Sequence, residues 1–427
     1  MEEWKKFKLG DIVSLVIDYR GKTPLKLGGN WSQSGYRALS AKNIKTGKIV
    51  NEESIKYVDE SLYVKWMKDE VQRGDILITS EAPFGQIYYW DSDEKIVLSQ
   101  RLFCLRISEK VYSKFVYYYM TTTVFQAELD GRATGTTVVG LRQPELLKCK
   151  IQLPSLEKQR EIASILSSLD NKIENNKRIN DNLEQQAQAL FKSWFVDFEP
   201  FKDQPFEESE LGMIPTSIKM SRVADISHTL ETGRRPKGGV GELTSGIPSV
   251  GAEHVKGLGN YDYSKTKYIS EEYATSLKTG KINGYELLIY KDGGKPGYFI
   301  PNFSIFGEGY PFDNCYLNEH VFKLDFEDKS YNAFCYFYFK TDYVMNYLNA
   351  LGGKAAIPGI NRNDIENILI ISPTNEIVKK FGSIILPIIK KILVNCKESR
   401  HLAQLRDLLL PKLMSGELKI NDVEKNL

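Results

Sequence analysis

One arrangement in the first third of the chain could bind a metal ion. Asp75 is followed by Asp93 and Lys95, the latter two within the run Asp-Glu-Lys. Two carboxylates and a lysine can hold Mg²⁺ and polarise a phosphate, as in nucleases. A strand entry at Asp75 and a polar turn over 91–95 explain the same residues more simply. A stand-alone Mg-dependent nuclease is therefore kept only as an alternative.

The motifs for nucleotide and methyl-transfer chemistry are incomplete. Gly21-Lys22-Thr23 matches the end of a Walker A loop, but Val16 stands where the first glycine is required. The Pro-Pro pair of DNA amino-methyltransferases is absent, the four histidines lack metal-ligand spacing, and the five cysteines form no Cys-x-x-Cys pair. With the opening MEEWKKF, which is no signal peptide, this predicts a cytoplasmic chain without metal, cofactor or catalysis of its own.

Basic residues are concentrated where nucleic acid could bind. The stretch 19–51 contains seven lysines and arginines and no acidic residue, although the net charge of the whole chain is only +2. Glycines break the stretch into loops, and Trp31 and Tyr36 lie among the cations. A solvated lysine-rich surface is the plainer alternative, but one-signed charge on loops with aromatic neighbours favours DNA contact. The stretch 197–210 is acidic and is predicted to be a hinge that faces away from DNA.

A glycine-hinged loop over 131–137 and its counterpart over 351–356 could bring backbone N–H groups to DNA, although a tight structural turn explains them equally well. The predicted DNA-contacting residues are Arg20, Lys22, Lys42, Asn43, Arg101, Arg132, Thr134, Thr136, Arg234, Arg235, Lys237, His254, Lys295 and Lys354. The runs 75–79 and 102–107 are predicted to be strands, and 111–129 is predicted to be a helix. The aromatic run Tyr117-Tyr118-Tyr119 in this helix has helical spacing, which favours core packing over a base-stacking platform.

These loops need a scaffold, and a heptad pattern supplies one. Spacings of four and three alternate without interruption along a seam. The seam comprises Ile162, Leu166, Leu169, Ile173, Asn176, Asn180, Leu183, Ala187, Leu190 and Trp194. It predicts a helix whose stripe runs for roughly 50 Å at 1.5 Å per residue. Such a stripe requires a partner helix.

The partner lies in the same chain, 219 residues further on. The matching seam comprises Phe381, Ile385, Ile388, Ile392, Asn395, Ser399, Leu402, Arg406, Leu409 and Leu413. Asn176 matches Asn395, so the polar break recurs, and a polar seam residue fixes register. Upstream the offset is 211, where the run 75–78 matches 286–289. The chain is thus a tandem repeat of globular unit and long helix.

The repeat order predicts that the two helices run antiparallel, because the first helix ends where the second unit begins. A parallel coiled coil between two chains is the alternative. Pro387 lies off the second seam and is expected to kink that helix without breaking the apolar stripe.

This layout resembles the specificity (S) subunits of type I restriction-modification systems. The residues that carry the resemblance are LPSLEKQREIASILSSLDNKIENNKRIN at 153–180, LEQQAQALFKSWFVDFEPF at 183–201, ELGMIPTSIK at 210–219 and LRDLLLPKLMSGEL at 405–418. KLGDIVSL at 8–15 and RVADISHT at 222–229 resemble the entries to the two target recognition domains.

The resemblance implies an α+β fold with a pseudo-twofold internal repeat. Two mixed α/β target recognition domains are separated by two long helices, which pack as an antiparallel coiled coil. The expected boundaries are 1–154 for the first domain, 155–200 for the first helix, 201–373 for a linker and the second domain, 374–418 for the second helix, and 419–427 for a tail.

The resemblance also implies a non-catalytic subunit that binds duplex DNA at an asymmetric bipartite site, one half per domain. The helices would set the spacer and dock two methyltransferase (M) subunits, and restriction/translocase (R) subunits would join for cleavage. S-adenosylmethionine, ATP and Mg²⁺ would bind the partners, and no membrane is involved. The separate S subunit of a related two-sided-cutting restriction system and a pure coiled-coil scaffold are the remaining alternatives.

Overall fold

The computed structural model describes residues 4–135, 139–241, 243–293, 297–353 and 358–418. The chain divides into two compact units. Unit 1 comprises Met1–Asn171 with Ala403–Leu427, and unit 2 comprises Lys172–Leu402. In the described part of the chain, none of the helices combines the length and apolarity that a membrane crossing needs.

Unit 1 is built on a four-stranded antiparallel sheet in the order β2-β10-β7-β8. Its strands are β2 (Val13–Asp18), β10 (Leu102–Ile107), β7 (Ile76–Thr79) and β8 (Ile87–Tyr89). All four residues of β7 are buried, as is typical of a central strand covered on both faces. A second sheet contains β6 (Lys56–Val58), β3 (Tyr36–Leu39) and β9 (Ile96–Leu98). Two pairs complete the unit: β1 (Lys5–Lys8) with β11 (Lys150–Leu153), and β4 (Ile44–Lys45) with β5 (Lys48–Ile49).

The helices of unit 1 are mostly short. They are α1 (Leu9–Ile12), α2 (Glu60–Trp66), α3 (Ser113–Thr121), α4 (Thr123–Asp130) and α5 (Gln143–Leu147), with 3₁₀ turns η1 (Leu25–Leu27), η2 (Ala41–Asn43) and η3 (Glu52–Ser54). The sequence predicts one helix over 111–129, and this is wrong: Thr122 is extended and separates α3 from α4. Its hydroxyl accepts the Phe125 N–H as an N-cap, a contact that hydrophobic periodicity does not reveal. The prediction that Tyr117, Tyr118 and Tyr119 are core residues is confirmed by their burial.

Unit 2 repeats this plan. Its main sheet has the order β15-β21-β18-β19, formed by β15 (Thr229–Thr232), β21 (Val321–Asp325), β18 (Leu287–Tyr290) and β19 (Phe303–Ile305). Its second sheet contains β17 (Lys267–Ile269), β16 (Ile247–Val250) and β20 (Tyr316–Leu317), and its pairs are β14 (Met220–Arg222) with β22 (Leu369–Ile371) and β12 (Phe206–Ser209) with β13 (Gly212–Pro215). Its shorter helices are α7 (Glu271–Ser276), α8 (Lys329–Phe339), α9 (Asp342–Gly352) and α10 (Arg362–Glu366), with 3₁₀ turns η4 (Glu199–Phe201), η5 (Val223–Asp225), η6 (Ala252–His254) and η7 (Tyr263–Lys265). The predicted internal repeat is confirmed, because equivalent strands occupy equivalent places in both sheets.

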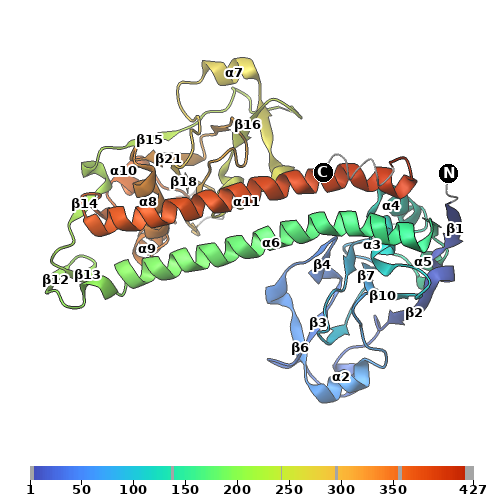
Figure 1. Ribbon diagram of the computed structural model, residues 1–427. Coiled ribbons are helices and arrows are strands. Elements are labelled where there is room, and N and C mark those ends of the chain that lie inside the picture. The colour runs from blue at the N-terminus through green and yellow to red at the C-terminus, as the bar shows by residue number, and fades with distance from the viewer. Residues whose placement is uncertain (1–3, 136–138, 242, 294–296, 354–357, 419–427) are drawn as a thin grey trace. The chain divides into compact units, whose positions relative to one another are not determined.

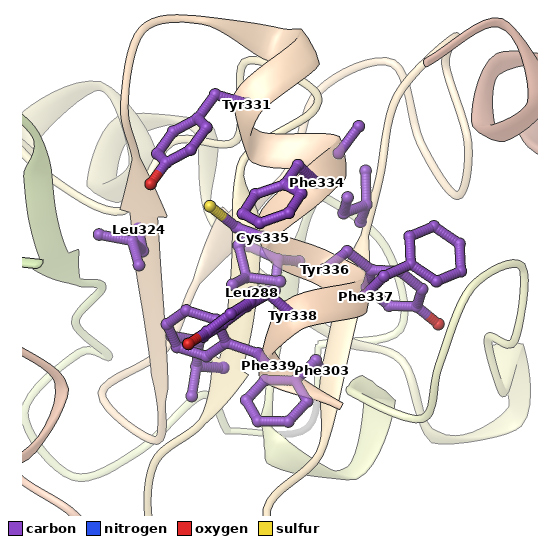
Figure 2. Close-up of a cluster of buried hydrophobic side chains, with 14 of the residues drawn as sticks. Leu288, Phe303, Leu324, Tyr331, Phe334, Cys335, Tyr336, Phe337, Tyr338 and Phe339 are labelled. Carbon is purple, nitrogen blue, oxygen red and sulfur yellow. The ribbon is translucent and has the colours of Figure 1, made fainter. Parts of the chain in front are cut away.

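Helix α8 fills the core of unit 2 with aromatic rings. Figure 2 shows the side chains of Phe334 and Tyr338 beside Leu288 and Leu324 of the sheet, all within one cluster of buried side chains. Phe334 packs face to face with Tyr331, with the ring centroids 5.6 Å apart. Aromatic pairs of this kind add about 1 kcal/mol each beyond the area that they bury.

Two helices of 40 residues each, α6 (Leu156–Phe195) and α11 (Glu376–Ser415), carry the predicted seams (Figure 1). Within unit 2 their segments run antiparallel. The rings of Phe191 and Phe381 lie 5.6 Å apart, while towards the start of α6 the Asn395 side-chain amide donates to Asn180 Oδ1 at 2.8 Å. Asn176 Nδ2 donates to Ser399 Oγ at 3.2 Å. The predicted antiparallel pairing within one chain is confirmed, and α11 continues through Pro387, which is exposed.

The seam continues within unit 1, where it is partly ionic. Arg406 occupies a seam position of α11, and its guanidinium binds Asp170 of α6 at 2.7 Å. Asp170 also accepts the hydroxyl of Tyr118 at 2.6 Å, which ties α3 to the helix pair. A charge at a half-buried position needs such a partner. The described seam side chains of both helices are buried or half-buried, and none is fully exposed.

Candidate nucleic-acid interface

In unit 1, the ends of three strands and one loop enclose a polar cleft of about 360 Å³. The loop between β2 and η1, the turn after β7, the residues before β10, Thr134 and the residues 140–142 meet there. This unit 1 cleft is lined by Arg20, Ser80, Glu81, Gln100, Arg101, Thr134, Gly140, Leu141 and Arg142. Three arginines against one carboxylate make it suitable for an anionic ligand such as DNA phosphate, and guanidinium forks also match the acceptors of guanine.

Arg20 is held in a fixed position at one side of this cleft. Its Nε and one terminal nitrogen bind the two oxygens of Asp18 at 2.8 and 2.9 Å. The guanidinium lies over the ring of Phe103, 4.0 Å from the centroid. About a third of the side chain stays exposed. The residue is thus preorganised, which lowers the entropy lost when it contacts a ligand.

Arg101 also lines this cleft, and its backbone lies in the left-handed region with φ of +63°. Its Nε is 2.9 Å from Glu81 Oε1, and about half of its side chain is exposed. The conformation is uncommon for a residue with a Cβ, and such strain is concentrated at functional sites. The structure therefore brings two of the predicted arginines, Arg20 and Arg101, to one cleft.

The loop over 131–135 is a closed turn that also lines the cleft. Thr134 and Gly140 exchange both backbone hydrogen bonds at 2.9 Å. Thr134 lies in the cleft, whereas Arg132 binds Glu128 at 2.8 Å and Glu145 at 3.5 Å. The charge of Arg132 is therefore largely compensated within the protein. The predicted contacts Thr136, Lys295 and Lys354 lie outside the described residues.

The two predicted lysines of the basic stretch, Lys22 and Lys42, differ in how available their side chains are for a ligand contact. Lys22 donates to the carbonyl of Trp66 and lies over the ring of Tyr19, 3.8 Å from its centroid. Burial, assisted by nearby Lys68, lowers the pKa of Lys22. Lys42 is exposed and lines a second cleft of about 440 Å³, together with Trp31. Lys42 is the freer of the two for a phosphate contact.

Asn43 and His254 occupy the same place in the two units, at the ends of η2 and η6, and both are 1% exposed. Asn43 Oδ1 accepts the Ser40 N–H at 3.1 Å, and His254 Nδ1 accepts the Gly251 N–H at 3.2 Å. Each side chain closes a 3₁₀ turn, so a base contact would require these bonds to break. Burial lowers the pKa of His254, and its Nε2 has no hydrogen-bond partner among the described residues.

Unit 2 has its own basic cleft, of about 550 Å³, in the equivalent place after β15. This unit 2 cleft is lined by Arg234, Arg235, Pro236, Lys237, Gly238, Gly239 and Glu319. It again combines three basic residues with one carboxylate. Arg235 Nε lies 2.5 Å from Glu319 Oε1. The structure thus brings three of the predicted basic residues of unit 2, Arg234, Arg235 and Lys237, into one cleft, which His254 does not line.

Sequence reasoning missed Glu81, Gln100 and Arg142 in unit 1, and Glu319 in unit 2. Each flanks a strand or helix that the internal repeat identifies. Gln100 and Glu319 are themselves repeat equivalents, at an offset of 219. Charged residues directly beside repeat-matched strands were therefore the available signal.

The residues of the nuclease alternative do not meet. Asp75 is buried and binds Arg106 at 3.0 and 2.8 Å. Asp93 pairs with Arg73 at 2.8 Å, and Lys95 pairs with Glu70 at 2.9 Å. Within the described ranges, no group of acidic, histidine and cysteine side chains has the arrangement of a metal site.

Known proteins resemble this chain over most of its length. A family model described as "Type I restriction modification DNA specificity domain" matches residues 1–185. The type I restriction enzyme MjaIX specificity subunit of Methanocaldococcus jannaschii is 30% identical over 357 residues, which are 82% of this chain and 79% of the relative. The HindI specificity subunit of Haemophilus influenzae is 25% identical over 485 residues, covering 98% of this chain and all of the relative. The crystal structure of the S subunit from M. genitalium has the same fold, with a TM-score of 0.58 at 17% identity and 96% of each chain covered.

Proposed function

The chain belongs to the family of type I restriction enzyme specificity subunits, and from this membership we propose how its two units divide DNA recognition. A specificity subunit is the non-catalytic, sequence-specific DNA-binding component of a restriction-modification complex. In our proposal, the unit 1 cleft contacts one half of an asymmetric bipartite site and the unit 2 cleft contacts the other half. The target recognition domains would comprise residues 1–154 and the part of 201–373 that follows the linker.

One observation carries this proposal. The two clefts lie at equivalent strand ends of a repeated fold, and each combines three basic side chains with one carboxylate. Keeping the position while changing the side chains is what modular readout of two different half-sites requires. The cations would contact phosphates, and the remaining polar groups would reach base edges.

The long helices have a separate role in the proposal. Helices α6 and α11 would set the length of the uncontacted spacer and dock two M subunits, with R subunits joining for cleavage. S-adenosylmethionine, ATP and Mg²⁺ would then bind the partner subunits. We expect the purified chain alone neither to methylate nor to cleave DNA, and methylation to appear when the cognate M subunit is added. A fully active complex with one M per S would contradict the two-fold docking.

The test of the proposed clefts is a double substitution, R20A with R101A, in the complex with M. The target is first identified by mapping methylated adenines in the host with and without the gene. We expect the double variant to bind that target roughly 100-fold more weakly or worse, because each of the two lost charge-assisted contacts to phosphate contributes about 1.5–3 kcal/mol. The slope of log affinity against log salt should also fall by about 0.9 for each phosphate that the variant no longer neutralises.

The matched control is R73A in unit 1, whose side chain is 50% exposed and lines neither cleft. It removes a surface arginine without touching a cleft and should bind like the wild type. Unchanged affinity and salt slope in R20A/R101A would show that the unit 1 cleft does not contact DNA.

A further inference from the structure

The position of Arg101 in unit 1 has an equivalent in unit 2 that sequence reasoning did not single out. Arg101 directly precedes β10, whose first residue pairs with the last residue of β7. His320 directly precedes β21, whose first residue pairs with the last residue of β18. The backbone agrees: the Arg101 carbonyl accepts the Ser80 N–H at 2.9 Å, and the His320 carbonyl accepts the Lys291 N–H at 3.0 Å.

The carboxylate partner is repeated as well. Glu81 follows β7 by two residues and pairs with Arg101. Asp292 follows β18 by two residues, and its Oδ1 binds His320 Nδ1. Both turns are also closed from the same side, by the backbone N–H of Leu141 in unit 1 and of Ile360 in unit 2. The two units thus present an acid–base pair of the same layout at the same strand ends.

From this equivalence we infer that His320 is a DNA-contacting residue of unit 2, at the position that Arg101 occupies in unit 1. The inference rests on the proposed function. About 37% of the His320 side chain is exposed, so a ligand can reach the ring. The residue also borders the unit 2 cleft, because its Nε2 lies 3.4 Å from Oε1 of Glu319, a residue that lines it.

The chemistry of histidine makes this contact depend on protonation. With its Nδ1–H donated to Asp292, a neutral ring has a bare Nε2, which can only accept a hydrogen bond. A protonated ring can donate from Nε2 to a phosphate oxygen or to the acceptor atoms of guanine. Histidine changes charge in the physiological range, whereas arginine is always charged. A donated contact from Nε2 in unit 2 therefore requires the protonated ring, whereas the equivalent arginine contact in unit 1 does not depend on protonation.

The charged groups around His320 are mixed in sign. Asp292 and Lys291 follow β18, with Lys291 Nζ 3.4 Å from Asp292 Oδ2. Glu319 precedes β21, and its carboxylate is shared with Arg235 from the segment after β15. Each carboxylate beside the ring already binds a cation, so two negative and two positive groups surround His320.

The test measures binding of a duplex carrying the mapped target by the complex with M, at about pH 5.5 and about pH 7.5, which bracket the ordinary histidine pKa. For the wild type we expect about tenfold weaker binding at the higher pH, the size of one charge-assisted hydrogen bond. H320Q should bind equally at both pH values, and H320R should bind tightly at both. R101H should add a second pH-dependent step.

Another histidine provides the control. H254N removes a buried histidine that does not line the unit 2 cleft, and it should keep the pH dependence of the wild type. Thermal melts at each pH verify that every variant is folded. If the wild type and H320Q share one pH profile while both bind the target selectively, the inference is overturned and the proposed function stands. If the wild type shows no preference for its target at either pH, the proposed function fails and the inference fails with it.

Discussion

The two clefts have the same frame but different side chains. Strand register makes Thr232 the counterpart of Asp18, because Thr232 pairs with Phe322 of β21 where Asp18 pairs with Phe103 of β10. Arg234 is therefore the counterpart of Arg20, but unit 2 has a threonine where unit 1 has the carboxylate that holds Arg20. The basic charge is thus equal in amount in the two clefts, and the groups that hold it in place differ. Side chains can be exchanged at strand ends without disturbing the sheets, because they add little to the core.

The cores differ less than the clefts. Asp75 in unit 1 and Glu286 in unit 2 are matched buried acids, each 2% exposed. Asp75 binds Arg106, whereas Glu286 accepts the N–H groups of Asn283 and Gly284, both at 2.7 Å. Both arrangements give the buried carboxylate bonding partners, which offset the free-energy cost of removing its charge from water. The two cores therefore keep the same requirement, a buried acidic side chain with bonding partners. The two clefts keep only their place at the strand ends.

The largest expected effect comes from exchanging residues 1–154 for the equivalent domain of a relative. Because the proposed readout is modular, one half-site should be replaced completely and the other should stay unchanged. Methylation mapping of the hybrid complex gives both half-sites in one measurement. A change in both halves would break the comparison, because the units would then read DNA jointly.

The next effect concerns the distance between half-sites. One inserted heptad in each long helix, between Asn176 and Asn180 and between Asn395 and Ser399, adds about 10.5 Å at 1.5 Å per residue. At about 3.4 Å per base pair, the spacer should grow by about three base pairs while both half-sites remain the same. Methylation of a library of spacer lengths measures this. An insertion of four residues is the contrasting variant, because it rotates the seam out of register. If the heptad variant is active and its spacer is unchanged, the M subunits or DNA bending set the distance between the half-sites.

Removing the buried acid of unit 1 should have a smaller, local effect. D75A leaves Arg106 without its partner and the Gln72 N–H without an acceptor. We expect the free energy of unfolding to fall by about 3 kcal/mol, as for broken buried pairs. D93A, which removes an exposed partner of Arg73, is the matched control and should leave denaturant melts unchanged. A free energy of unfolding in D75A as high as in the wild type would mean that Asp75 does not stabilise the fold.

The smallest expected effect is a pH dependence of stability at His254, which the equivalent residue of unit 1, Asn43, cannot contribute. Burial keeps the pKa of folded His254 below its unfolded value, so the unfolded state binds the proton first as the pH falls. Stability should therefore be complete above about pH 6.5 and decrease below it, with a slope of at most about 1.4 kcal/mol per pH unit. H254N, which copies the residue of unit 1, should remove this component from melts recorded across the range. A steeper decrease in acid for H254N than for the wild type would contradict the assignment.

Much of the architecture was predictable from local and repeating patterns. The heptad spacing predicted both long helices, and the offset of 219 residues predicted that their seams pair. Strands such as β7 and β10 were visible as apolar runs, because a strand buried on both faces must be apolar throughout. The basic residues of both clefts other than Arg142 were also predicted, because charged residue types can be read from the sequence alone.

The sequence by itself therefore determined the repeat, the helix pair and the location of the basic loops, since periodicity and composition are local in the chain. Only the tertiary structure decided which residues are free to act. Asn43 is engaged in closing a 3₁₀ turn, Arg132 is neutralised by two glutamates, and Asp75 is paired with Arg106. Only the strand register placed His320 opposite Asp292. These partners lie up to tens of residues apart in the chain, and a side chain's availability depends on what the fold places beside it.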